Sequence, residues 1–204
     1  MLEVIIPGFK TLKLKSLVLD LNGTLATDGV IPEKVIKKLN KLKQILNIFI
    51  ITAGTHGKLE EISEKTSAKL VSITELEEKW EEYYILITES PPKSIIVNKL
   101  GNVIFKESHL LKTKSPLLIK IKPKNGSKQK RDFVNKIGAQ NCICIGNGSN
   151  DASMFKECKL SIAIIGQEGL STLDLNNADI LVKDICDALD MLSNPKRIIA
   201  TLRR

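Results

Sequence analysis

The chain has 204 residues, of which 43% are hydrophobic and 26% charged, and its formal net charge is +8. This length corresponds to one domain with room for an insertion, and the composition is typical of a soluble globular protein. No apolar stretch approaches the roughly 18 residues of a membrane span, and the acid Glu3 argues against a secretory signal. We therefore expect a cytoplasmic protein with no membrane partner.

The positive charge is spread along the whole chain and is densest at residues 120–136 and 197–204. Aromatic residues make up only 4% of the chain and are not interleaved with these clusters, which argues against a platform for single-stranded nucleic acid. Nucleic-acid binding therefore rests on charge alone and is a minor alternative. A solvated, lysine-rich surface is the preferred interpretation.

The four cysteines indicate no disulfide framework, which suits a reducing cytoplasm. Cys142 and Cys144 alternate with isoleucines, so in a strand they would share one face. We expect these two, together with Cys158 and Cys186, to be small buried core residues and not metal ligands.

The first part of the chain alternates predicted strands with predicted helices. Hydrophobic periodicity and turn residues identify the elements, which in chain order are two short strands within 2–15, a buried strand at 17–20, a helix at 33–46, and then a strand at 48–52, a helix at 58–65 and a strand at 70–73.

The middle of the chain differs, because strands follow one another there without helices between them. After an expected exposed helix at 74–83, the predicted strands lie at 84–88, 94–98, 102–106 and 117–122. We interpret 84–122 as a small β-rich insertion into a core domain formed by 1–83 and 123–204.

Alternation of strands and helices resumes after the insertion. The expected elements are a helix at 127–137, a strand at 142–145, a loop at 146–151, a helix at 152–157, strands at 160–164 and 180–182, and a helix at 184–192 before a basic tail. This order predicts an α/β fold with a doubly wound parallel sheet.

Polar residues stand where these strands end or the following helices begin. Asp20 and Thr52 end two strands, Asp151 follows the strand at 142–145, and Lys130 lies near the start of a helix. Ligands gather at the carboxyl ends of parallel strands. Two carboxylates, a hydroxyl and an ammonium group are what phosphoryl transfer through an aspartyl-phosphate needs. In this hypothesis Asp20 attacks phosphorus, Thr52 donates to a phosphoryl oxygen, Lys130 balances charge and Asp151 helps to hold Mg²⁺.

Each assignment has a plainer alternative. Asp20 also fits an ordinary strand-to-loop turn, and Thr52 fits a threonine at the end of a strand. Lys128 competes with Lys130 for the role of the ammonium group. Asn150 could cap the following helix or hydrogen-bond a phosphoryl group, and the two roles are compatible.

Taken together and in this order, the motifs resemble those of the haloacid dehalogenase-like (HAD) hydrolase superfamily. The matching segments are 20–25 for the DxDGT motif, 48–52 for the strand that ends in Thr, Lys130 for the third motif, and 146–151 for GDGxND. The segments 146–151, 160–164 and 178–182 also resemble the phosphorylation domain of P-type cation ATPases. The closest resemblance is to the soluble P-type ATPase-like family, which is mostly archaeal.

The resemblance implies a HAD-like Rossmannoid core whose insertion forms a cap over the Asp20 edge of the sheet. It implies a Mg²⁺-dependent phosphohydrolase or phosphotransferase acting on a small phosphate ester. The implied catalytic residues are Asp20, Asn22, Thr52 and Lys130. The implied substrate-binding residues are Gly23, Thr24, Ala53, Gly54 and Asn150, and the implied metal ligands are Asp20, Asn22, Asn147 and Asp151.

Two amides stand where members of the superfamily usually carry acids. Asn22 occupies the position of the general acid and base, and Asn147 that of a metal-binding aspartate. Slow turnover and weaker Mg²⁺ binding are therefore expected. Thr52-Ala53-Gly54 also departs from the Thr-Gly-Asp of the ATPases, which weakens the case for ATP-specific contacts. A rival hypothesis is a catalytically weak regulatory module that binds phosphate or Mg²⁺.

Overall fold

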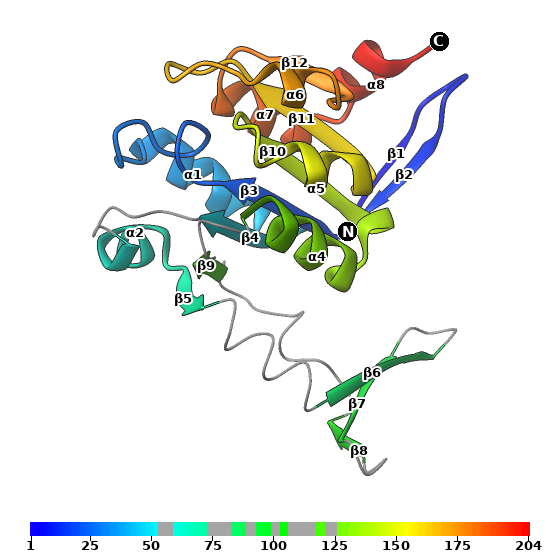
Figure 1. Ribbon diagram of the computed structural model, residues 1–204. Helices are drawn as coiled ribbons and strands as arrows, with labels where there is room; N and C mark the ends of the chain where they lie inside the picture. The colour runs from blue at the N-terminus through cyan, green and yellow to red at the C-terminus, as the bar shows by residue number, and fades with distance from the viewer. Residues whose placement is uncertain (53–58, 73–82, 89–92, 99–102, 106–116, 121–125) are drawn as a thin grey trace.

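The computed structural model describes the chain apart from residues 53–58, 73–82, 89–92, 99–102, 106–116 and 121–125. Its centre is a seven-stranded sheet in which every neighbouring pair is parallel. In sheet order the strands are β12 (Ile180–Val182), β11 (Leu160–Ile164), β10 (Cys142–Gly146), β3 (Ser16–Asp20), β4 (Asn47–Thr52), β9 (Leu117–Lys120) and β5 (Lys69–Ser72). The predicted α/β fold with a doubly wound parallel sheet is confirmed (Figure 1).

The central strands are buried on both sides. All residues of β3, β10 and β11 are buried, which explains why these segments are nearly continuous apolar runs. Helices cover the two faces, and the ligand-facing edge of such a sheet lies at the carboxyl ends of its strands.

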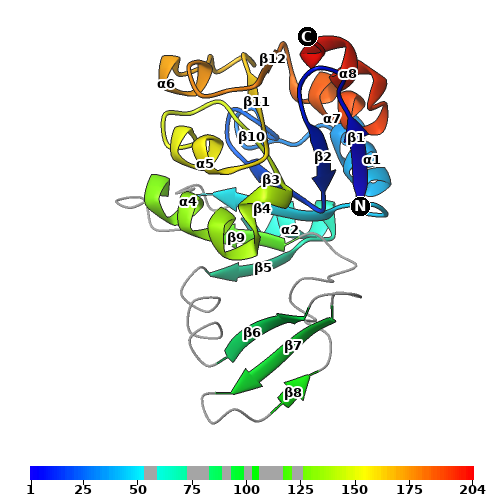
Figure 2. The same cartoon turned by 90° about the vertical axis from the view of Figure 1, so that its right-hand side faces the viewer.

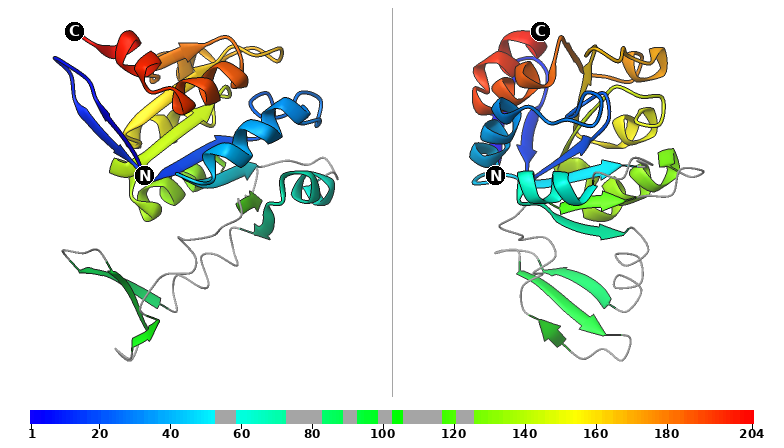
Figure 3. Two further views of the ribbon diagram at one scale, coloured as in Figure 1. Left: turned by 180° about the vertical axis from the view of Figure 1, so that it is seen from behind. Right: turned by 90° about the vertical axis from the view of Figure 1, so that its left-hand side faces the viewer.

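One face carries α1 (Glu33–Leu42), α2 (Leu59–Thr66) and α7 (Ile185–Ser193), with α8 (Lys196–Leu202) packed beside α7. Their buried side chains, such as Leu39 and Leu189, join Leu17 and Leu19 of β3 in the larger core. Figure 3 shows α1 in blue and the two last helices in orange and red on this face.

The opposite face carries α4 (Gly126–Ile137) and α5 (Ala152–Glu157), with α6 (Thr172–Leu175) next to α5 (Figure 2). Phe133 of α4 packs edge-on against Phe49 of β4, with ring centroids 5.2 Å apart. Cys142 and Cys144 of β10 lie in this second core, as predicted. Cys158 and Cys186 are only half-buried, because each lies at the end of a helix and not in a central strand.

The N-terminal residues form the predicted hairpin, with β1 (Leu2–Ile5) antiparallel to β2 (Thr11–Leu14). Its inner side chains are buried against the larger core. The basic tail beyond Pro195 forms the helix α8, which packs against α7 and β1 and whose Ile198 is fully buried. None of the helices that the structure describes is long and apolar enough to cross a membrane.

The predicted β-rich insertion needs one correction. Its first three strands, β6 (Tyr83–Thr88), β7 (Lys93–Asn98) and β8 (Val103–Phe105), form a separate antiparallel sheet. The last one, β9, instead lies in the core sheet between β4 and β5, where Leu118 and Ile119 are fully buried. The insertion proposed at 84–122 therefore extends too far at its C-terminal end. The expected overhang of this lobe above Asp20 stays a prediction, and the expected helix at 74–83 falls almost entirely outside the described residues.

Candidate active site

A buried cluster of three charges lies at the carboxyl ends of the central strands. Asp20 is the last residue of β3, and Asp151 follows the loop after β10 and starts α5. Lys130 reaches this edge from α4 and is fully buried. Its Nζ donates to Oδ1 of Asp20 at 2.5 Å and to Oδ1 of Asp151 at 2.6 Å. The structure thus brings together residues from three distant parts of the chain.

Burial and unequal charge set the protonation of this cluster. Burial, and then the negative charge of Asp151, raise the pKa of Asp20 to about 7, although Lys130 acts in the opposite direction. Burial alone would lower the pKa of Lys130, but the two carboxylates more than compensate, so its pKa lies above the ordinary value. Lys130 is therefore an ammonium group at neutral pH, and Asp20 titrates near neutrality in the metal-free protein.

The loop after β10 folds around the carboxylate of Asp151. Its Oδ2 accepts hydrogen bonds from the backbone N–H groups of Asn147, at 3.2 Å, and Gly148, at 3.1 Å. A Cβ on Gly146 would lie 2.4 Å from that same oxygen, so this close approach requires glycine. Both oxygens of Asp151 are thus occupied by protein donors.

The loop after β3 is joined to the loop after β10 by side-chain contacts. The hydroxyl of Thr24 donates to Oδ1 of Asn147 at 3.0 Å, and Nδ2 of Asn147 donates to the carbonyl of Gly169 at 3.0 Å. Gly23 has φ +73°, and a Cβ there would lie 2.4 Å from Nδ2 of Asn147. A Gly-Thr sequence therefore lets the two loops pack directly against each other.

The remaining candidate residues are arranged around this centre. Nδ2 of Asn22 lies 3.5 Å from Oγ1 of the buried Thr52, at the long end of hydrogen-bond geometry. Asn150 is half-buried and precedes Asp151, which is the N-cap of α5, so Asn150 is not the cap. Lys128 is exposed, whereas Lys130 meets Asp20. Ala53 and Gly54 lie outside the described residues.

The oxygen atoms at this site could bind a hard cation such as Mg²⁺ weakly. Among the described residues, no three His, Cys, Asp or Glu side chains are placed to hold a metal ion. Mg²⁺ binds through one or two carboxylates and keeps several waters. The carboxylate of Asp20, whose side chain is 11% exposed, could hold Mg²⁺ together with the amide oxygen of Asn147 and the carbonyl of Asn22. Asp151 would have to give up a protein donor to join them.

Asp174 is a buried acid near the site that sequence reasoning missed. It is 0% exposed, and neither of its oxygens makes a hydrogen bond of ordinary geometry with the described residues. Burial, and then the charge of Asp151, raise its pKa to about 8, and the backbone N–H of Ala152 only partly opposes this rise. The pattern Ser171-x-x-Asp174 is that of a capping box, which would turn the acid toward the Ser171 N–H. That N–H donates to the carbonyl of Asn147 instead, so Asp174 does not complete a capping box on α6.

Comparisons with known proteins place this geometry among hydrolases. A family model described as haloacid dehalogenase-like hydrolase matches residues 56–167, more than half of the chain. The matched region includes Lys130, Asn147 and Asp151, whereas Asp20 precedes it. Among individual sequences, the uncharacterized protein MJ0073 of Methanocaldococcus jannaschii is 49% identical over 61 residues, which are 30% of this chain and 66% of that protein. The match thus spans just under two thirds of that relative's length.

Solved structures share the fold at low sequence identity. The cobalt-bound deoxy-D-mannose-octulosonate 8-phosphate phosphatase of Haemophilus influenzae superposes with a TM-score of 0.56 at 12% identity, covering 94% of both chains. The 3-deoxy-D-manno-octulosonate 8-phosphate phosphatase of Moraxella catarrhalis, in complex with magnesium, phosphate and KDO, gives 0.54 at 14% identity with the same coverage. At this identity the likeness establishes the fold alone.

Replacing Lys130 by methionine should destabilise the protein strongly. The change leaves two buried carboxylates without their cation, which costs about 3–5 kcal/mol of unfolding free energy. The loss should be largest near pH 8 and smaller near pH 5, where protonation relieves the repulsion. Urea denaturation at the two pH values measures it. Lys128→Met, on the exposed side of the same helix, serves as the control and should change little.

Asp174→Asn should stabilise the metal-free protein at pH 8 but not at pH 5. Because the pKa of Asp174 is raised from 3.8 to about 8 in the folded state, its contribution to stability falls as the pH rises through this range. An amide of the same shape removes that dependence. Thermal unfolding in EDTA is the measurement, and Asp132→Asn on the exposed surface of α4 is the control. Equal pH profiles for wild type and Asp174→Asn would contradict the assignment.

Proposed function

Since the chain belongs to the haloacid dehalogenase-like hydrolase family, we propose that it is a phosphohydrolase that uses Asp20 as its nucleophile. The observation that carries this proposal is the contact of Lys130 with both Asp20 and Asp151 at the carboxyl edge of the sheet. A carboxylate held beside a buried ammonium group can approach an anionic phosphate, because the ammonium compensates the charge of both.

The proposed reaction has two steps. An oxygen of Asp20 forms a bond to phosphorus while the bond from phosphorus to the leaving oxygen breaks, and that oxygen takes a proton from solvent. Water then attacks the aspartyl-phosphate, loses a proton, and releases inorganic phosphate and free Asp20. In this proposal Thr52 and the backbone of the loop after Asp20 donate to the phosphoryl oxygens, and Lys130 balances their charge.

Mg²⁺ is the proposed cofactor, held by Asp20 with the neutral oxygens of Asn22 and Asn147. When bound, the cation supplies charge neutralisation between the carboxylate and the phosphate. Two neighbouring structures are those of phosphatases that contain cobalt or magnesium, which supports a divalent cation here. Since Asp20 is the one carboxylate of this proposed ligand set, weak binding is expected.

We assign the chain, within the family, to the soluble P-type ATPase-like kind. The support is the resemblance of segments 146–151, 160–164 and 178–182 to the ATPase phosphorylation domain, together with Asn22, whose amide can hydrogen-bond but cannot act as a general acid or base near neutral pH. In the structure Nδ2 of Asn22 lies 3.5 Å from Oγ1 of Thr52. The proposed substrate is a small phosphate ester, in keeping with the phosphorylated sugar acids named for the neighbouring phosphatases.

A regulatory module that binds phosphate with little turnover is the second candidate. It is favoured by Asn22 and Asn147, two amides at positions where catalysis and metal binding would be served by acids, and by the engagement of Asn147 in hydrogen bonds between loops. Calorimetric titration with beryllium fluoride separates the candidates. Tight binding without turnover on a broad panel of phosphate esters would favour the module.

Asp20→Asn should reduce the hydrolysis of an aryl phosphate by at least about a hundredfold, because the nucleophile is lost. The assay is run with and without Mg²⁺, and wild type should depend on the cation. The control is Asp132→Asn, which removes the charge of an exposed aspartate on α4 and should retain full activity. Equal rates for wild type and Asp20→Asn would end the proposal.

Asn22→Asp should raise steady-state phosphatase activity by at least about tenfold, since general acid–base catalysis contributes roughly 10²–10⁴-fold. Hydrolysis of the aspartyl-phosphate needs a base whatever the leaving group was, so the intermediate should accumulate in wild type and disappear faster in the variant. Acid-quench mass spectrometry measures its lifetime. If wild type already hydrolyses rapidly, or if both quantities stay unchanged in Asn22→Asp, the role given to position 22 is wrong.

A further inference from the structure

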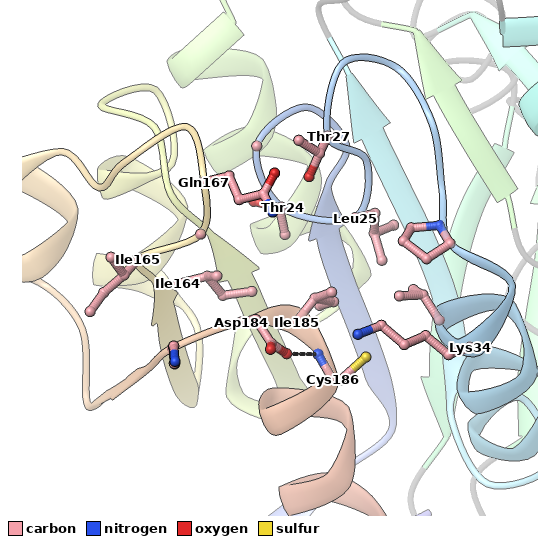
Figure 4. A pocket seen from close by; sticks show the side chains of 15 residues that line it. Thr24, Leu25, Thr27, Lys34, Ile164, Ile165, Gln167, Asp184, Ile185 and Cys186 are labelled. Atoms are coloured by element: carbon pink, nitrogen blue, oxygen red, sulfur yellow. Dashed lines mark hydrogen bonds between the residues drawn. The ribbon is translucent and has the colours of Figure 1, made fainter.

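A cavity of about 330 Å³ opens on the face of the sheet that carries α1 and α7. This volume lies at the low end of the range for small-molecule sites, roughly 300–1,000 Å³. Its walls come from the loop after β3, the start of α1, the end of β11 and the start of α7 (Figure 4). The apolar part of the lining includes Leu25, Val35, Ile164 and Ile185.

The cavity is separate from the phosphoryl-transfer site. Val35 and Ile185 belong to the larger core on the α1 and α7 face. Lys130 and Asp151 approach Asp20 from α4 and α5, on the opposite face. The two sites share only Gly23 and Thr24, which lie between them at the end of β3.

The charges that line the cavity favour an anion. Lys34 and Lys183 both contribute to the wall, and within the described part of the chain neither side chain forms an ion pair or hydrogen bond. Lys34 extends from α1 toward Cys186 at the start of α7 (Figure 4). Asp184 also lines the cavity, but its Oδ1 accepts from the backbone N–H groups of Cys186 and Asp187 and so caps α7, and the two lysines outnumber this one acid. Two ammonium groups with no partner among the described residues therefore border an apolar floor.

We propose that this cavity is an effector site for a small organic anion with an apolar body. The apolar part would fill the space between Leu25, Val35 and Ile185, and the anionic group would meet the ammonium groups of Lys34 and Lys183. Binding removes apolar surface from water and gives both ammonium groups a counter-charge. No covalent step is involved.

Occupation of the cavity would act on the phosphoryl site through the shared loop. Thr24 lines the cavity and also donates its hydroxyl to Oδ1 of Asn147, which is a proposed metal ligand of the phosphoryl-transfer site. The loop after β11 also packs closely against the loop after β3, since a Cβ on Gly166 would lie 3.0 Å from the carbonyl oxygen of Gly23. A ligand that packs on this segment would shift the position of Thr24 and, through their hydrogen bond, the position of the Asn147 side chain. This effector role rests on the proposed function, whereas the binding itself does not.

The binding test uses hexanoate and 1-hexanol in calorimetric titrations of the full chain. Hexanoate should bind saturably, and 1-hexanol, which has the same carbon number without the charge, should bind at least about tenfold more weakly. Lys34→Gln combined with Lys183→Gln should weaken hexanoate binding about tenfold. Lys41→Gln, also exposed on α1 but outside the cavity, should leave the affinity unchanged.

Two further measurements test whether hexanoate binds in this cavity and not at the phosphoryl-transfer site. Hexanoate should slow alkylation of Cys186, which lines the cavity, but not that of the equally half-buried Cys158, as peptide mass spectrometry can measure. Hexanoate should still bind the Asp20→Asn variant. For the effector role, hexanoate should change the affinity of the wild-type protein for beryllium fluoride by at least about threefold, as expected for coupled sites. Absence of saturable binding, insensitivity to the lysine changes, or mutually exclusive binding of hexanoate and beryllium fluoride would overturn the site. An unchanged beryllium fluoride affinity would overturn the effector role. If Asp20→Asn shows the phosphohydrolase proposal to be wrong, the hexanoate titrations and Cys186 protection still decide the cavity independently.

Discussion

The buried ammonium group of Lys130 is the interaction on which the site depends. For its Nζ to reach both Asp20 and Asp151, α4 must lie against the ends of β3 and β10 in one orientation. The edge-on contact of Phe49 with Phe133 holds the same helix on the sheet. Removal of a charge from water costs several kcal/mol unless partners compensate it. The three groups are therefore stable in this place only as a unit, and they tie together the folding of three distant segments.

This unit carries two negative charges and one positive, and the imbalance gives the site its chemistry. Burial, together with the excess negative charge, raises the pKa of Asp20 to about 7, so its ionised form is favoured when a cation or another positive group completes the balance. Around it the chain uses amides and backbone N–H groups in place of further acids. Asn147 joins two loops, and Asp151 organises one. Beyond the three buried charges, the site is thus completed by neutral hydrogen-bonding groups.

Much of this arrangement could be predicted from the sequence, because it depends on local pattern. Apolar runs identify the core strands, and since parallel strands end at a common edge, the positions of Asp20 and Asp151 after two such runs already predict that they lie close together. What could not be predicted depends on tertiary contacts. The pattern around Asp174 is that of a helix cap, but its expected donor is used by Asn147. The alternation at 117–122 suggests a half-exposed strand, yet β9 is covered on both sides once β4 and β5 flank it.

The place of β9 also bears on the order in which the protein can assemble during its synthesis. β5 joins the sheet through β9, and β9 is made only after the whole of the small antiparallel lobe. Until Leu117 has left the ribosome, β4 has an unpaired edge, and such edges are prone to pairing with other chains. At roughly 5–20 residues per second, the wait between Thr52 and Leu117 lasts several seconds. The length of the lobe therefore sets how long the nascent chain must keep this edge from aggregation.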